Sequence, residues 1–143
     1  MKNLKFVIFF FLINSCVFNQ VNKEKVIFNI RFDSCFDNDT VSLYLDNNEL
    51  FNNYILKTND IVSLTPIYVS YLNNGIIEVY NGEELLLKKK IELNKSIKVT
   101  VFLNDNETSK SIEISNGKNI TIDGCAPDSK VNIHQYKKKV IYD

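Results

Sequence analysis

The sequence predicts an all-β fold, and three observations support this prediction. Apolar and polar residues alternate with a period of two along most of the chain after residue 25, as they do in strands with one buried face. The alternating segments are short, and turns rich in Asn, Asp and Gly separate them. No ten-residue window has a clean helical stripe. We therefore expect an antiparallel β-sandwich of about eight or nine strands, with an immunoglobulin-like or transthyretin-like layout.

The first half of the chain contains five alternating segments. They are 26–32, 40–46, 49–56, 63–72 and 76–80. Pro66 lies inside the fourth segment, and because proline cannot donate to a strand ladder, we expect an edge position or a bulge there. Asn81-Gly82 follows the fifth segment and is the strongest hairpin signal in the chain, typical of a type I′ turn.

The second half continues the same alternation. The segments are 83–93, 96–103, 111–115, 119–123 and 130–136, with 139–142 as a further candidate. The polar stretch 104–110 (NDNETSK) is predicted to be an exposed loop. No linker rich in Pro, Gly or Ser interrupts residues 26–143, which predicts a single domain over that range.

The first 15 residues have the pattern of an export signal. Lys2 and Lys5 give a positive start, and residues 6–13 form an uncharged apolar run. This run is too short to cross a bilayer as a helix, because that requires about 20 apolar residues. A positive start, a short apolar core and a small residue at its end predict a signal peptide over 1–15. Residues 16–25 would then connect the cleavage site to the domain.

Ile13-Asn14-Ser15-Cys16 resembles the lipobox of bacterial lipoprotein signals, with an aliphatic, a variable and a small residue before a cysteine. The resemblance covers the first 16 residues only. It implies that Cys16 receives a diacylglycerol and becomes the first residue of a membrane-anchored cell-envelope protein. Two or more acyl chains anchor a protein stably. The alternative is ordinary secretion after a cut nearby, in which case Cys16 has no such role.

Two cysteines remain once the lipoprotein resemblance assigns Cys16 to the lipid. They are Cys35 and Cys125, and two thiols in an exported domain suggest one disulfide. Such a bond would connect the first strand of the domain to its last. The alternative is two free thiols that never meet, because proximity in space cannot be deduced from sequence.

Three segments place an aromatic residue opposite the aliphatic face of a strand, just before or near a turn. These residues are Tyr44, Tyr80 and Phe102. If their strands are neighbours, the side chains form a row that could stack on sugar rings or on the apolar edge of a partner. The alternative is that they cover a second packed layer or lie on lysine stems.

The charge balance argues against nucleic acid as a partner. Removal of the leader, with Lys2 and Lys5, leaves 15 basic and 17 acidic residues, and no basic stripe is present. Lys88-Lys89-Lys90 and Lys137-Lys138-Lys139 could contact anionic lipid, but lysines on an edge strand also prevent unwanted sheet pairing.

Catalytic and metal-binding motifs are absent from the sequence. His134 is the only histidine, and neither a CxxC, a GxSxG nor an HExxH motif occurs, so we expect no metal, no cofactor and no enzymatic activity. The expected function is a lipid-anchored binding or structural module, with the membrane and another envelope protein or a glycan as partners. Two alternatives remain. One is an inhibitor or protective protein that uses the loop 104–110, and the other is a sugar-binding accessory that uses the aromatic row.

Overall fold

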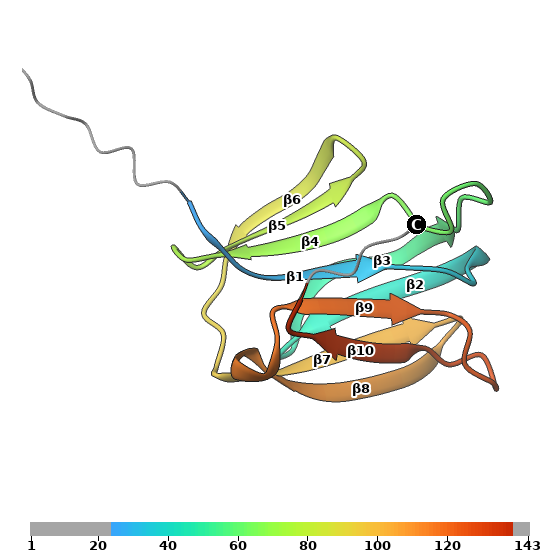
Figure 1. The fold of residues 1–143 in the computed structure, drawn as a ribbon. Helices are drawn as coiled ribbons and strands as arrows, with labels where there is room; N and C mark the ends of the chain where they lie inside the picture. Colours follow the sequence, from blue (N-terminus) through green and yellow to red (C-terminus); the bar gives the residue numbers. More distant parts are fainter. Residues whose placement is uncertain (1–23, 139–143) are drawn as a thin grey trace, which may run out of the picture.

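The computed structural model describes residues 24–138 and confirms the all-β sandwich. Within these residues, a six-stranded sheet with the order β10-β9-β1-β4-β5-β6 packs on a four-stranded sheet with the order β3-β2-β7-β8 (Figure 1). The strands are β1 (Val26–Phe32), β2 (Asp37–Leu45), β3 (Asn48–Lys57), β4 (Ile67–Leu72), β5 (Ile76–Asn81), β6 (Glu84–Lys90), β7 (Ser96–Leu103), β8 (Asn106–Glu113), β9 (Asn119–Asp123) and β10 (Asn132–Tyr136).

The period-two pattern produces a single apolar core between the sheets. On β7, for example, the odd-numbered residues Ile97, Val99 and Val101 are buried, whereas Lys98 is exposed. Because side chains alternate between the two faces of a strand, one face of each sheet becomes apolar and must be covered by the other sheet. For β1, β7 and β9 the structure also confirms the predicted strand bounds, residue for residue.

One pairing differs from the predicted antiparallel arrangement. β1 pairs with β9 in parallel, from Asn29 opposite Asn119 to Phe32 opposite Ile122, whereas the other paired strands are antiparallel. Alternation of side chains is the same in both kinds of ladder, so the residue pattern did not distinguish them. The immunoglobulin-like or transthyretin-like layout stays a prediction, and the candidate strand 139–142 lies outside the described residues.

The predicted loop at 104–110 is wrong. Only Asn104 and Asp105 form the turn, with φ of 47° and 70°, and β8 starts at Asn106 and pairs with β7 along its whole length. Two positive φ values are typical of a type I′ hairpin turn. β8 is an edge strand with mostly exposed side chains, so its first half has no apolar alternation that would reveal it.

Two other turn predictions are corrected. The hairpin between β5 and β6 turns at Gly82-Glu83, and only Gly82 has a positive φ (59°), which is typical of a type II′ turn rather than type I′. Pro66 is neither on an edge strand nor in a bulge. It precedes Ile67, where the central strand β4 begins, so that the predicted strand 63–72 loses its first four residues.

The strands define two ends of the sandwich. β1 starts at the end that we call proximal and finishes at the end that we call distal (Figure 1). The segments 33–36, 58–66, 82–83, 104–105 and 124–131 lie at the distal end. Among residues 24–138, no helix has the length and apolar character needed to cross a membrane.

Candidate functional site

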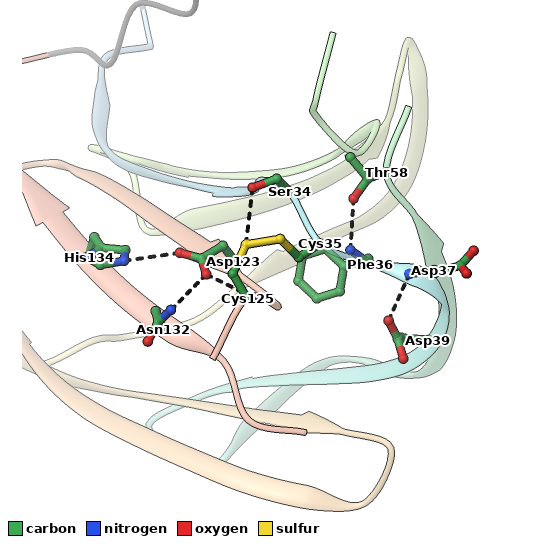
Figure 2. Close-up of a disulfide and its surroundings, with 10 residues drawn as sticks. All are labelled: Ser34, Cys35, Phe36, Asp37, Asp39, Thr58, Asp123, Cys125, Asn132 and His134. Atoms are coloured by element: carbon green, nitrogen blue, oxygen red, sulfur yellow. Dashed lines mark hydrogen bonds and ion pairs between the residues drawn. A yellow bond between two sulfur atoms is a disulfide. The ribbon is translucent and has the colours of Figure 1, made fainter. Parts of the chain in front are cut away.

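A disulfide between Cys35 and Cys125 lies at the distal end and confirms the predicted pairing (Figure 2). The two Cα atoms are 5.1 Å apart, across a sequence separation of 90 residues. Cys35 follows β1 and Cys125 follows β9, so the bond connects the ends of the two parallel neighbours. The second strand in this connection is therefore β9, and not the last strand as predicted.

The backbone around the disulfide is closely packed. The Gly124 N–H donates to the Ser34 carbonyl oxygen at 3.0 Å, and a methyl group added at Gly124 would collide with the carbonyl oxygen of Cys35. Cys35 itself has a φ of 66°, in the left-handed region that few residues other than glycine adopt. The residue after β9 must therefore be glycine if the segment after β1 is to pack against it. The disulfide joins the two segments at the same place.

This segment and the last residue of β1 hold the two ends of the loop 58–66. The Phe36 N–H donates to the Thr58 hydroxyl at 2.9 Å, and the Thr58 N–H donates to the Phe36 carbonyl at 2.8 Å. At the other end of the loop, the buried Thr65 hydroxyl donates to the Phe32 carbonyl at 2.8 Å. The loop is therefore fastened to the core through the residues on either side of Cys35.

Hydrogen bonds inside the loop present two aliphatic side chains to solvent. The Asn59 side-chain oxygen accepts the N–H groups of Ile61 at 2.9 Å and Val62 at 3.3 Å, and the Ser63 N–H donates to the Asn59 carbonyl. Ile61 is 91% exposed and Val62 is 55% exposed. We call Ile61 and Val62 the loop tip. Single exposed aliphatic residues are common, but an adjacent pair on an ordered loop favours a contact site.

Two surface hollows flank this loop. One, of about 580 Å³, is lined by residues 57–60, Val62 and residues 64–66. The other, of about 540 Å³, lies between residues 34–37 and the base of the loop. Val62 lines the first hollow itself, so this side chain of the loop tip borders a depression in the surface.

A polar cluster beside the disulfide has a structural role. His134 Nε2 lies 3.1 Å from Asp123 Oδ2, while Asp123 Oδ1 accepts the Asn132 amide at 2.9 Å and the Cys125 N–H at 3.0 Å (Figure 2). Asp123 thus caps the turn after β9 and connects it to β10. In the described part of the chain, no group of three or more His, Cys, Asp or Glu side chains is placed to hold a metal ion.

The three predicted aromatic residues do not form one row. Tyr44 on β2 and Phe102 on β7 meet edge to face on the outer side of the four-stranded sheet, with ring centroids 5.8 Å apart. Tyr80 lies on β5 in the other sheet, stacked on Tyr68 at 4.9 Å. The condition for a row, that the three strands are neighbours, is met for only two of them.

Polar groups surround the pair of Tyr44 and Phe102. The Tyr44 hydroxyl donates to the Glu49 carboxylate at 2.9 Å, and this hydrogen bond raises the pKa of Tyr44 because it stabilises the neutral phenol. On the same sheet, Ser42 bonds to Asn52 at 2.8 Å, and Thr100 bonds to Ser109 at 2.9 Å. We call this surface the aromatic face.

The ring stack on the six-stranded sheet was not predicted. Tyr68 lies between Tyr80 on β5 and Arg31 on β1, whose Cζ atom is 5.7 Å from the Tyr68 ring centroid. Because neighbours cover both faces of Tyr68, this ring is a poor surface for sugar stacking. Recognising the stack requires knowing that β1, β4 and β5 are adjacent.

The loop tip was also missed, although Ile61-Val62 interrupts a polar stretch of the sequence (TNDIVSLT). Comparison with protein-family models, with curated proteins and with solved structures finds no match to this chain.

Proposed function

We propose that the protein is an exported, lipid-anchored binding module of the cell envelope, without catalytic activity. The disulfide is compatible with export, because such bonds persist in oxidising compartments. The leader pattern over 1–15 and the lipobox-like Cys16 supply the anchor in this proposal, and both lie outside the described residues. Ordinary secretion remains the alternative to anchoring.

The loop tip is the observation on which the binding role rests. It is ordered by side-chain and backbone hydrogen bonds, so little conformational entropy would be lost when a partner covers it. Burial of one Ile or Val side chain contributes about 1.5–3 kcal/mol. The tip lies at the distal end, whereas β1, which follows the anchor segment, starts at the proximal end (Figure 1). An anchored molecule can therefore present the tip to another envelope protein.

The surroundings of His134, the single histidine in the sequence, support the proposal that the protein has no catalytic activity. His134 bonds to Asp123, which is itself held by Asn132 and the Cys125 backbone, so the pair stabilises a turn. Nucleophilic catalysis would require His134 to activate a hydroxyl or thiol group. No hydrogen bond within residues 24–138 connects it to one.

Metabolic labelling tests the anchor. Cells that express the full chain receive an alkyne fatty acid, and we expect label on the wild type but not on Cys16→Ala. Val17→Ala serves as the control, because it changes the residue next to Cys16, leaves all three cysteines in place and should keep the label. Equal labelling of the wild type and Cys16→Ala, or an unlabelled wild type in the culture medium, would contradict anchoring.

Crosslinking in cells tests the loop tip. The variant Ile61→Asp/Val62→Asp should lose a crosslinked partner protein that the wild type keeps. Ile55→Asp is the matched control, because Ile55 is 57% exposed on β3 and is not in the loop. The three proteins should unfold at the same urea concentration. An identical set of crosslinked proteins for all three would reject the binding role of the tip.

A second candidate function is glycan binding at the aromatic face. The pair of Tyr44 and Phe102, surrounded by hydroxyl, amide and carboxylate groups, has the composition of a sugar site. Titration with envelope oligosaccharides should detect binding that Phe102→Ala abolishes and Tyr80→Ala retains, because Tyr80 lies in the other sheet. Binding that both variants retain, or no binding by the wild type, would reject this candidate.

A further inference from the structure

β6 is an edge strand that extends beyond the sandwich. Among the described residues it pairs only with β5, at the rim of the six-stranded sheet (Figure 1). All of its residues are exposed except the half-buried Leu87, and Leu85 and Leu86 are 45% and 37% exposed. An exposed edge presents backbone N–H and C=O groups that can pair with another strand.

Acidic and basic residues lie at opposite ends of the segment 83–90, which contains β6. Two acids, Glu83 and Glu84, precede three leucines, and three lysines, Lys88, Lys89 and Lys90, follow them. Lys88 already bonds to Glu78 on β5 at 2.7 Å. Within residues 24–138, none of the salt bridges involves Glu83 or Glu84, and none involves Lys89 or Lys90. Two negative and two positive groups are thus left without an ion-pair partner at opposite ends of one edge strand.

A β-bulge places one acid and one lysine on the same face of β6. Glu84 pairs with Asn81 and Lys89 pairs with Ile77, two β5 residues of the same parity. In a regular strand, residues 84 and 89 would point to opposite faces, because their separation is odd. The register shift between Val79 and Tyr80 removes this difference. Residues directly opposite each other in a ladder must share a face, and Glu84 and Lys89 now meet this requirement.

We propose that β6 pairs antiparallel with β6 of a second copy of this chain, about a two-fold axis. In this register Glu84 of each copy lies opposite Lys89 of the other, and the turn residue Glu83, which precedes β6, lies at the end of the ladder near Lys90. In the same register Leu86 of each copy lies opposite Leu87 of the other, next to the axis, and Leu85 lies opposite the aliphatic stem of Lys88. A two-fold interface uses the same patch on both subunits, which a self-complementary strand satisfies.

The charge order selects this partner over others. Lysines on an edge strand normally oppose pairing, because like charges placed directly opposite destabilise a ladder. A parallel second copy in register would put Lys opposite Lys and Glu opposite Glu. The antiparallel second copy turns both contacts into attractive ones. The inference does not depend on the proposed anchor or on the loop tip.

Charge reversal tests the pairing. The full chain is expressed with export, and the purified protein is examined by sedimentation velocity across the micromolar range. We expect a dimer for the wild type. Glu83→Lys/Glu84→Lys and Lys89→Glu/Lys90→Glu should each weaken self-association about tenfold or more, because every cross-strand pair becomes repulsive. An equimolar mixture of the two variants should form a heterodimer with the affinity of the wild type.

Two controls make the result specific. Lys137→Glu/Lys138→Glu changes the net charge by the same amount as Lys89→Glu/Lys90→Glu, but away from β6. It should leave the dimer intact. About 1 M salt, which shortens the Debye length to about 3 Å, should weaken the wild-type dimer. A wild type that stays monomeric, or a mixture that fails to restore the dimer lost by the single variants, overturns the proposal. Neither result would alter fatty-acid labelling at Cys16 or crosslinking through Ile61.

Discussion

Phe36 and Thr58 hold each other through two hydrogen bonds across 22 residues of sequence. The Phe36 N–H donates to the Thr58 hydroxyl at 2.9 Å, and the Thr58 N–H donates to the Phe36 carbonyl at 2.8 Å. Phe36 follows Cys35 directly and is only 2% exposed. The disulfide, the core and the base of the loop 58–66 are thus connected at one point, and this connection gives the loop tip a fixed base.

Replacement of the Thr58 hydroxyl should loosen this connection. Thr58→Val keeps the shape of the side chain but leaves the Phe36 N–H without its acceptor, which should lower the free energy of unfolding by about 1–2 kcal/mol. Thr58→Ser keeps a hydroxyl and should remain close to the wild type. Urea unfolding of the three proteins measures the difference. A Val variant as stable as the wild type would show that this hydrogen bond contributes nothing.

Loss of the disulfide should cost more. For a sequence separation of 90 residues, the chain-entropy model gives a contribution of about 4–5 kcal/mol. Cys35→Ser/Cys125→Ser, or the wild type with reductant, should therefore unfold at a much lower urea concentration. Peptide mapping without reductant should find the linked pair, and Cys16→Ala is the control that keeps it. Two alkylated thiols in the native protein would contradict the bond.

The aromatic residues should couple within a sheet and not between sheets. Tyr44→Ala and Phe102→Ala remove two rings in contact, so a double-mutant cycle should give a coupling free energy of about 0.5–1.5 kcal/mol. Tyr80 and Phe102 lie in different sheets. The losses of unfolding free energy caused by Tyr80→Ala and Phe102→Ala should therefore add within about 0.3–0.5 kcal/mol. Thermal or urea unfolding of the five variants measures both values. Equal coupling in the two cycles would contradict the placement of Tyr80.

Glu78 should lose its proton at unusually low pH. The hydrogen bond from Lys88 is the main cause that lowers the pKa of Glu78, and the Tyr80 hydroxyl adds to it, whereas burial opposes it. Since the folded-state pKa is depressed, the stabilisation is present above the unfolded-state pKa of about 4.3 and is lost as the pH falls through the lower folded-state value.

NMR titration of the Glu78 carboxyl carbon checks this expectation. Lys88→Gln should move the pKa of Glu78 back toward the ordinary range, while Lys90→Gln, the control, should leave it unchanged. An unperturbed titration in the wild type would show that the contact with Lys88 does not persist in solution.

The candidate sites show where prediction from sequence ends. The pairing of Cys35 with Cys125 could be predicted, because few thiols remained once Cys16 was assigned to lipid. The meeting of Tyr44 with Phe102 could only be stated as a condition, since it depends on β2 and β7 being neighbours. The order of the loop tip depends on Phe32 and Phe36, which are distant in sequence from Ile61.

For β1, β7 and β9 the sequence by itself determined the bounds of the strand and which side chains turn inward, whereas the first half of β8, which has no apolar alternation, was predicted to be a loop. Alternation is a local property, because each side chain points to the face opposite its neighbour whatever strand lies beside it. Only the tertiary structure decided which strands pair, that β1 and β9 run parallel, and that β5 carries Tyr80 into the other sheet. Several strand orders bury the same apolar faces, and contacts between residues far apart in sequence select one of them.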